Sequence, residues 1–174
     1  MKPPAALAPA LAPALTLLLA ACGTPSQQQQ AGQSPGARLE AAAVRAGLVI
    51  DPAGANLTGS WALDTDRLCI VPADRKTLRI GALVNYGQGQ GCAASGTARR
   101  HGDRVAVTFG ACAFEASFDA DKIVFPPELP AACDRFCTGR ATLAALSVEH
   151  VSTATSEAET LRAPSGRTLC TQGQ

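Results

Sequence analysis

In Arg104-Val105-Ala106-Val107-Thr108-Phe109, every second side chain is a large apolar one. Successive side chains of a β-strand point to opposite faces, so this stretch would place its bulky apolar groups on one face. A Gly110-Ala111 turn follows, and Cys112 to Phe118 then repeats the alternation. Together the two runs predict a β-hairpin with one face in a hydrophobic core.

Other short apolar stretches lie on both sides of this hairpin and are separated by Gly, Pro or Asp. Closely spaced strands with no long helix between them are typical of antiparallel sandwiches and barrels. The sequence therefore predicts a mainly β fold, a small antiparallel β-barrel or sandwich, with its core at about residues 57–151. The further strands that we expect are Trp61–Leu63, Arg67–Val71, Thr77–Tyr86, Cys92–Arg99, Lys122–Phe125 and Ala141–Val151.

Short peripheral helices are expected at the edges of this β region. Arg38 to Ala46 carries Leu and Ala at helical spacing and is followed by Gly47, a common helix stop. Ser152 to Arg162 has an apolar side and a Ser156/Glu159 capping pattern, with a loop as the alternative. We expect a single β-rich domain over residues 38–174.

The chain begins with Met1-Lys2 and an uncharged, Ala- and Leu-rich run that leads to Cys22. This arrangement is typical of a secretory signal peptide, and several prolines in the run argue against a membrane-spanning helix. Leu19-Ala20-Ala21-Cys22 resembles the lipobox of bacterial lipoproteins. The resemblance implies a signal peptide at residues 1–21, cleavage after Ala21 and a lipid on the thiol of Cys22.

Acylation at Cys22 would anchor the protein stably, because more than one acyl chain is expected there. In enterobacterial lipoproteins, a residue other than Asp after the cysteine is typical of the outer membrane. Gly23 therefore predicts an outer-membrane protein of the bacterial cell envelope. Residues 22–37 are rich in Gln, Gly, Ser and Pro. Such a segment buries too little apolar surface to offset its ordering entropy, which indicates a flexible linker.

Charge and motifs argue against nucleic acid, metal and catalysis. The sequence has 15 Lys and Arg and 14 Asp and Glu, and the two counts become equal once Lys2 is removed with the signal peptide. Nucleic-acid binding needs a basic patch, which this balance does not favour. Neither His101 nor His150 belongs to a metal-ligand spacing, and no nucleophile-elbow or zinc-helix motif occurs. Asp64-Thr65-Asp66 and Asp119-Ala120-Asp121 are expected in hairpin turns. We expect no enzyme activity, catalytic residue, metal or cofactor.

Of the seven cysteines, six remain besides Cys22, and an even number in a small exported chain indicates disulfides. A metal site is the alternative, but the closest pair, Cys133 and Cys137, is one residue too wide for C-x-x-C and has no nearby His. The spacing alone leaves every pairing open. The candidate half-cystines are Cys69, Cys92, Cys112, Cys133, Cys137 and Cys170.

The sequence Leu57-Thr58-Gly59-Ser60-Trp61-Ala62-Leu63 is followed by Cys69 and Cys92. This region resembles the opening of the Inh-type inhibitors of secreted metalloproteases. The resemblance implies an eight-stranded antiparallel barrel in which Trp61 closes one end, and a disulfide between Cys69 and Cys92. The other two pairs that we expect are Cys112–Cys133 and Cys137–Cys170.

In that family the inhibitory segment is the stretch just before the barrel, which implies a protein-binding role for this stretch here. Gly91 to Thr97 is also similar to part of a META-type lipoprotein domain, and Ser95-Gly96 to a motif of lipid-anchored lysozyme inhibitors. The sequence thus predicts a non-enzymatic, lipid-anchored binding protein that inhibits a secreted protease. The alternative is a structural envelope lipoprotein without inhibitory activity. The predicted binding residues are Asp51, Pro52, Ala53, Gly54, Ala55 and Asn56.

Replacing the lipid acceptor tests the anchor. We expect Cys22→Ser to abolish acylation and to leave an unprocessed precursor, because the modification needs a thiol. Metabolic labelling with radioactive palmitate measures the acylation, with Ser26→Ala as a control that keeps the thiol. Label that persists in Cys22→Ser would refute the assignment.

Overall fold

The computed structural model describes residues 34–51 and 54–171, so the signal peptide, Cys22 and most of the linker lie outside the described residues. The chain divides into two units, of which one ends at Ala46 and the other begins at Gly47. The predicted domain start at residue 38 therefore falls inside the first unit.

The described part of the first unit is helix α2 (Pro35–Arg45). It begins earlier than the predicted Arg38, because Ser34 caps it and Pro35 occupies its first turn. The Ala37 amide donates to Ser34 Oγ over 3.1 Å. Within the described ranges, no helix is long and apolar enough to cross a lipid bilayer.

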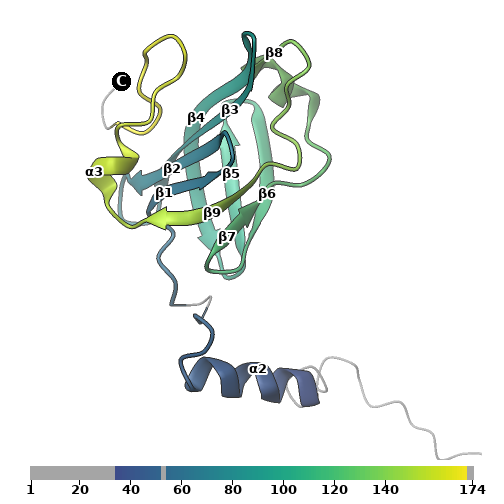
Figure 1. Ribbon diagram of the computed structural model, residues 1–174, viewed down its shortest axis with the longest axis vertical. Helices are drawn as coiled ribbons and strands as arrows, with labels where there is room; N and C mark the ends of the chain where they lie inside the picture. Colours follow the sequence, from purple (N-terminus) through teal and green to yellow (C-terminus); the bar gives the residue numbers. More distant parts are fainter. Residues whose placement is uncertain (1–33, 52–53, 172–174) are drawn as a thin grey trace, which may run out of the picture. The chain divides into compact units, whose positions relative to one another are not determined.

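The second unit is a closed antiparallel barrel, so the predicted mainly β fold is confirmed. Eight strands form the ring: consecutive strands pair from β1 to β7, and β9 inserts between β7 and β1 (Figure 1). A short additional strand, β8 (Cys137–Thr138), pairs with the start of β4. The ring strands are β1 (Gly59–Leu63), β2 (Asp66–Pro72), β3 (Leu78–Gly87), β4 (Gln90–His101), β5 (Arg104–Phe109), β6 (Cys112–Phe118), β7 (Lys122–Val124) and β9 (Ser147–Ser152).

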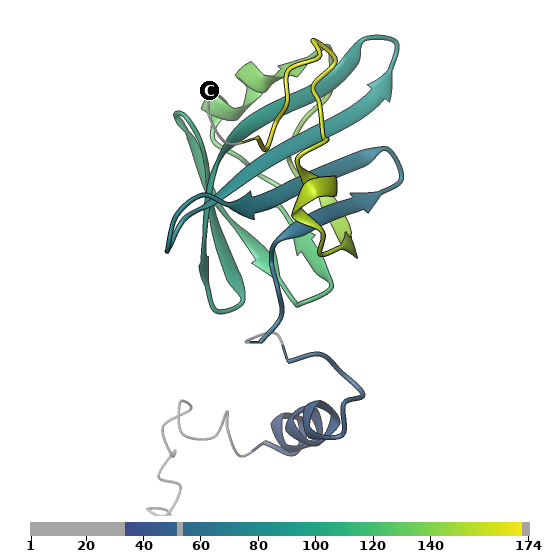
Figure 2. The same ribbon diagram turned by 90° about the vertical axis from the view of Figure 1, so that its left-hand side faces the viewer.

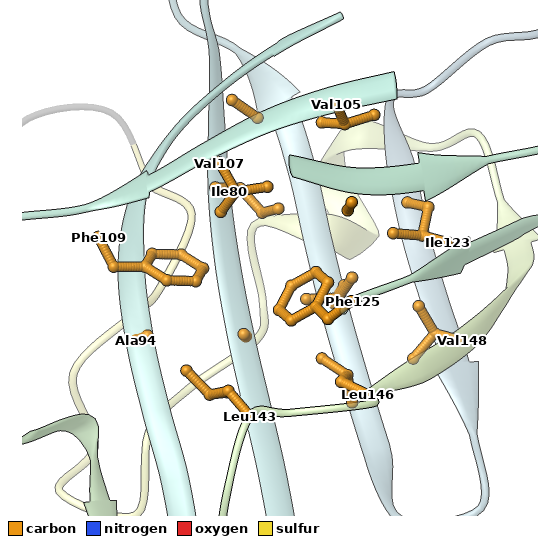
Figure 3. Close-up of a cluster of buried hydrophobic side chains, with 14 of the residues drawn as sticks. Ile80, Ala94, Val105, Val107, Phe109, Ile123, Phe125, Leu143, Leu146 and Val148 are labelled. Carbon is orange, nitrogen blue, oxygen red and sulfur yellow. The ribbon is translucent and has the colours of Figure 1, made fainter. Parts of the chain in front are cut away.

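The barrel interior is filled by the alternate side chains that the β5–β6 hairpin predicts. Val105, Val107 and Phe109 are each at most 1% exposed. Figure 3 shows them facing Phe125 and Ile123 across the interior. The strands expected between residues 61 and 125 are all present, with small shifts at their ends. The alternation was therefore a sufficient guide to which face of this hairpin is buried.

The strand predicted over Ala141–Val151 is wrong in its first half. β9 begins only at Ser147, because the chain turns at Ala145, whose φ is +57°. Leu143 and Leu146 are nevertheless buried, at 1% and 3% exposure. They therefore close the core from a loop rather than from a strand.

The helix predicted over Ser152–Arg162 is reduced to one turn, α3 (Thr155–Ala158). The expected Ser156/Glu159 capping pattern is wrong, since Ala154 takes the N-cap position and offers no side-chain hydrogen bond. A 3₁₀ helix, η2 (Ala131–Phe136), precedes β8. Both helices lie outside the ring of strands (Figure 1).

All six predicted half-cystines are paired, as Cys69–Cys170, Cys92–Cys137 and Cys112–Cys133. The predicted Cys112–Cys133 bond is confirmed, whereas the predicted Cys69–Cys92 and Cys137–Cys170 bonds are wrong. Cys69 and Cys92 lie on opposite faces of the sheet: Cys92 belongs to the interior core and Cys69 to a smaller cluster outside it. Cys137 is instead the direct cross-strand partner of Cys92.

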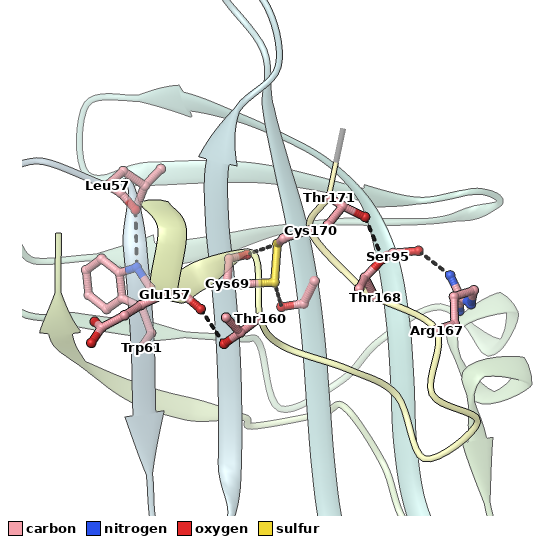
Figure 4. Close-up of a disulfide and its surroundings, with 11 residues drawn as sticks. Leu57, Trp61, Cys69, Ser95, Glu157, Thr160, Arg167, Thr168, Cys170 and Thr171 are labelled. Atoms are coloured by element: carbon pink, nitrogen blue, oxygen red, sulfur yellow. Dashed lines mark hydrogen bonds between the residues drawn. A yellow bond between two sulfur atoms is a disulfide. The ribbon is translucent and has the colours of Figure 1, made fainter. Parts of the chain in front are cut away.

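The tail after β9 covers the outer face of β2, β3 and β4 (Figure 2). Its apolar residues pack with Cys69 and Val71 in the outer cluster. Gly81 on β3 permits this contact, because a Cβ there would lie 2.5 Å from Leu169 Cβ and 2.7 Å from Cys69 Sγ. The Cys69–Cys170 bond fixes the tail to β2 at the same place (Figure 4).

Replacing both cysteines of one disulfide at a time should show how much each bond stabilises the protein. The loss should be larger for the bond that closes the longer stretch of chain. The sequence separation is 101 for Cys69–Cys170 and 21 for Cys112–Cys133. Loop-closure entropy then predicts losses of about 5 and about 3 kcal/mol in the free energy of unfolding. Urea unfolding of Cys69→Ala/Cys170→Ala and Cys112→Ala/Cys133→Ala measures this difference, and all four cysteines are at most 2% exposed. A linked Cys69–Cys92 peptide in a digest of the wild type would contradict the pairing.

Candidate functional site

The residues predicted to bind a partner lie in the segment that joins Gly47 to β1, here named the leading segment (residues 47–58). Pro52 and Ala53 lie outside the described residues. Of the other predicted residues, Ala55 is partly buried and the remainder are exposed. Their binding role stays a prediction.

Local hydrogen bonds turn the leading segment toward the barrel. The amides of Gly54 and Ala55 donate to the Asp51 carbonyl over 3.0 and 3.1 Å. Asn56 Oδ1 then accepts hydrogen bonds from both the amide and the hydroxyl of Thr58, at 2.9 and 2.8 Å. Asn is well suited to this position, because its short side chain bonds to the backbone two residues ahead.

Leu57 and Trp61 close the end of the barrel beneath this segment, here named the capped end. Leu57 is 4% exposed and Trp61 is fully buried, so the predicted burial of Trp61 is confirmed. The indole Nε1–H donates to the Leu57 carbonyl over 3.2 Å, as Figure 4 shows. The buried indole nitrogen is thereby satisfied, and the same bond ties the leading segment to β1.

Arg100 of β4 joins the leading segment to two other parts of the capped end. Its Nη1 donates to the Ala55 carbonyl over 2.6 Å, and its Nε donates to the Gly102 carbonyl over 3.0 Å. The guanidinium carbon lies 4.7 Å from the centre of the Phe118 ring. This distance suits a cation–π contact. The contact fixes the Arg100 guanidinium in place and so stabilises its hydrogen bond to the Ala55 carbonyl.

The beginning of the leading segment is apolar and exposed. Leu48, Val49 and Ile50 expose 80%, 51% and 54% of their surface. No sequence motif predicts a role for this run, and its exposure becomes evident only in the structure. A group of exposed apolar residues is unusual unless it takes part in binding. In the described part of the segment, hydrogen bonds thus fix the residues next to β1, whereas the first residues are apolar and exposed.

His150 of β9 completes the capped end. Its ring lies 4.4 Å from the Trp61 ring, and its amide donates to the Asp121 carbonyl over 2.8 Å. Its buried Nε2 has no hydrogen-bond partner among the described residues, and the ring packs against the Trp61 indole. His101, in contrast, is exposed at the end of β4, before the turn to β5.

Asp64, Asp119 and Asp121 lie in hairpin turns, as predicted, whereas Asp66 is the first residue of β2. Burial raises the pKa of the Asp66 carboxyl above its ordinary value, and the Asn85 backbone N–H lowers it in part. Asp119 Oδ1 accepts the Lys122 amide over 2.8 Å and so stabilises the β6–β7 turn. Among the residues that the structure describes, no group of three or more His, Cys, Asp or Glu could hold a metal ion.

Comparison with known proteins adds no relative: no protein-family model, no curated protein and no solved structure matches the chain. The resemblances to lipoproteins and to Inh-type inhibitors stay predictions from the quoted motifs.

Truncating Trp61 should destabilise the barrel through a cavity at the capped end. We expect Trp61→Ala to lower the free energy of unfolding by about 3–5 kcal/mol. Val151→Ala is the matched control, because Val151 lies nearby on β9 but is 64% exposed, and it should change the stability by about 0.5 kcal/mol or less. Urea unfolding gives both values.

The wild-type fluorescence comes from a single Trp and should be poorly quenched by iodide, because that residue is buried. Strong quenching in the folded protein would contradict this burial.

Proposed function

We propose that this protein is a non-enzymatic, lipid-anchored lipoprotein of the bacterial cell envelope that binds and inhibits a secreted protease through its leading segment. The observation that carries the proposal is the contrast along that segment. Its end is fixed at Ala55 and Leu57, whereas Leu48, Val49 and Ile50 are exposed before it.

A segment held in this way suits the inhibition of a peptidase. The described residues between Gly47 and β1 belong to no helix or strand, so their backbone is not already paired within the barrel sheet and can extend along a peptide-binding cleft. Fixing one end reduces the ordering entropy that binding costs. The exposed apolar residues supply contacts that exclude water from such a cleft. The resemblance to Inh-type inhibitors favours a metalloprotease as the target.

The rigidity of the support favours inhibition over cleavage of the segment. Arg100, Trp61 and Phe118 come from three different strands and all contact one another or the leading segment. After a cleavage, the half of the segment next to β1 would stay on this support, which would slow its dissociation from the protease. The lipobox supplies the remaining part of the proposal, since acylated Cys22 would keep the inhibitor at the membrane.

A triple substitution in the leading segment tests the inhibitor function. We expect Leu48→Ser/Val49→Ser/Ile50→Ser to weaken inhibition of a responsive secreted metalloprotease at least tenfold, because apolar anchors carry most of the energy of such interfaces. The melting temperature should stay unchanged, since these side chains are exposed. Titration of protease activity with the wild type and the variant measures the loss.

The matched control replaces three exposed apolar residues of the barrel wall, as Leu63→Ser/Tyr86→Ser/Val151→Ser. It should inhibit like the wild type. Failure of the wild type to form a saturable, stoichiometric complex with any protease in a panel of secreted enzymes would overturn the inhibitor function. Co-purification with wall or outer-membrane material would then favour the structural alternative.

A further inference from the structure

A hollow of about 690 Å³ lies between the outer face of the β3–β4 hairpin and the loop after α3. Leu83 and Ala93 contribute apolar surface from β3 and β4, and Phe136 contributes a ring from the end of η2. Pockets that bind small molecules are of this size and are lined mostly by apolar groups. The hollow shares no lining residue with the leading segment, so it is independent of the proposed inhibitor function.

Two arginines on the loop side give this hollow its chemical character. Arg162 Nη1 donates to the Gly166 carbonyl over 3.0 Å, and Arg167 Nη1 donates to Ser95 Oγ over 2.9 Å. Figure 4 shows Arg167 reaching toward Ser95. A guanidinium has five N–H donors, so these bonds leave donors on both side chains for a ligand. Among the described residues that line the hollow there is no Asp or Glu, so none of them carries a carboxylate that balances the two charges.

The walls of the hollow are held in place before any ligand binds. The Cys92–Cys137 disulfide ties its β4 side to β8, where Thr138 Oγ1 donates to the Gly89 carbonyl over 2.8 Å. The loop is closed on itself, since the Ala163 amide donates to the Arg167 carbonyl over 2.8 Å. Preformed walls lower the entropy that binding costs.

We propose that this hollow binds a small amphipathic carboxylate, with its apolar body on Leu83, Ala93 and Phe136 and its carboxylate on Arg162 and Arg167. The fork of N–H groups on a guanidinium matches the two oxygens of a carboxylate. Apolar surface alone would accept a neutral molecule equally well. The two arginines therefore determine the charge of the ligand, and the apolar surface determines which kind of molecular body it carries.

The probe is 4-phenylbutyrate, a soluble carboxylate with an aromatic body, and its uncharged match is 4-phenylbutanamide. Isothermal titration calorimetry uses the full chain as isolated from the expressing cells, in phosphatidylcholine nanodiscs, with empty nanodiscs as the blank. We expect saturable binding of the acid and binding of the amide at least tenfold weaker, since a charged hydrogen-bond partner is lost. Equal binding of both, or no saturable binding of the acid, overturns the proposal.

Substitutions locate the site. Arg162→Gln and Arg167→Gln should each weaken binding of the acid about tenfold, and Arg167→Lys should restore part of it because the charge returns. Arg104→Gln, on the exposed side of β5, should leave the affinity unchanged. Ser95→Ala removes the Arg167 hydrogen bond but keeps the guanidinium, so it should still bind the acid. An equal loss in Arg104→Gln, or a complete loss in Ser95→Ala with an unchanged melting temperature, would overturn the assignment of the two arginines.

Discussion

The insertion of β9 between β7 and β1 is the constraint on which the rest of the structure depends. Without β9, both neighbours would be sheet edges with unpaired backbone groups. The approach is close, because a Cβ on Gly59 would lie 1.9 Å from the Ser152 carbonyl oxygen. Gly59 also has a φ of +129°, which residues with a side chain rarely adopt. Closure of the barrel therefore requires glycine at the point where the leading segment joins β1.

Closure also creates the capped end, since its residues are far apart in the sequence. The β1–β9 register places Trp61 opposite His150, and the ring of Phe118 meets Trp61 edge-on at 5.9 Å. Arg100 reaches Ala55 while its guanidinium covers Phe118. The leading segment is thus held by groups from several strands at once. An open sheet of the same strands would not bring these groups together, so the proposed function depends on the ring as much as on the segment.

The sequence correctly predicted the features that neighbouring residues determine. It did not predict those that depend on contacts between distant parts of the chain. The β5–β6 hairpin follows from alternation and a two-residue turn, which involve no other part of the chain. The disulfide pairing depends instead on which face each cysteine takes. Cys69 lies in the run Leu68–Val71, in which every residue is at most 2% exposed, so its neighbours do not reveal its direction. Likewise, Leu48 to Ile50 are residues of a kind that is normally buried, and only the folded chain shows their exposure.

The burial of β2 on both faces also explains why the tail is covalently fixed. A barrel wall buries alternate residues, so a strand with four consecutive buried residues, Leu68 to Val71, needs a second cover, as parallel strands between helices do. The tail provides this cover with few fully buried apolar residues, chiefly Ala158 and Leu169. Such a small area does not offset the ordering entropy of the residues after β9. The Cys69–Cys170 bond supplies the missing stabilisation, because it removes most of the freedom that the tail would otherwise gain by detaching. The tail does not fill the space along its whole path, because its buried apolar residues gather near this bond, and a hollow remains between its loop and the β3–β4 hairpin.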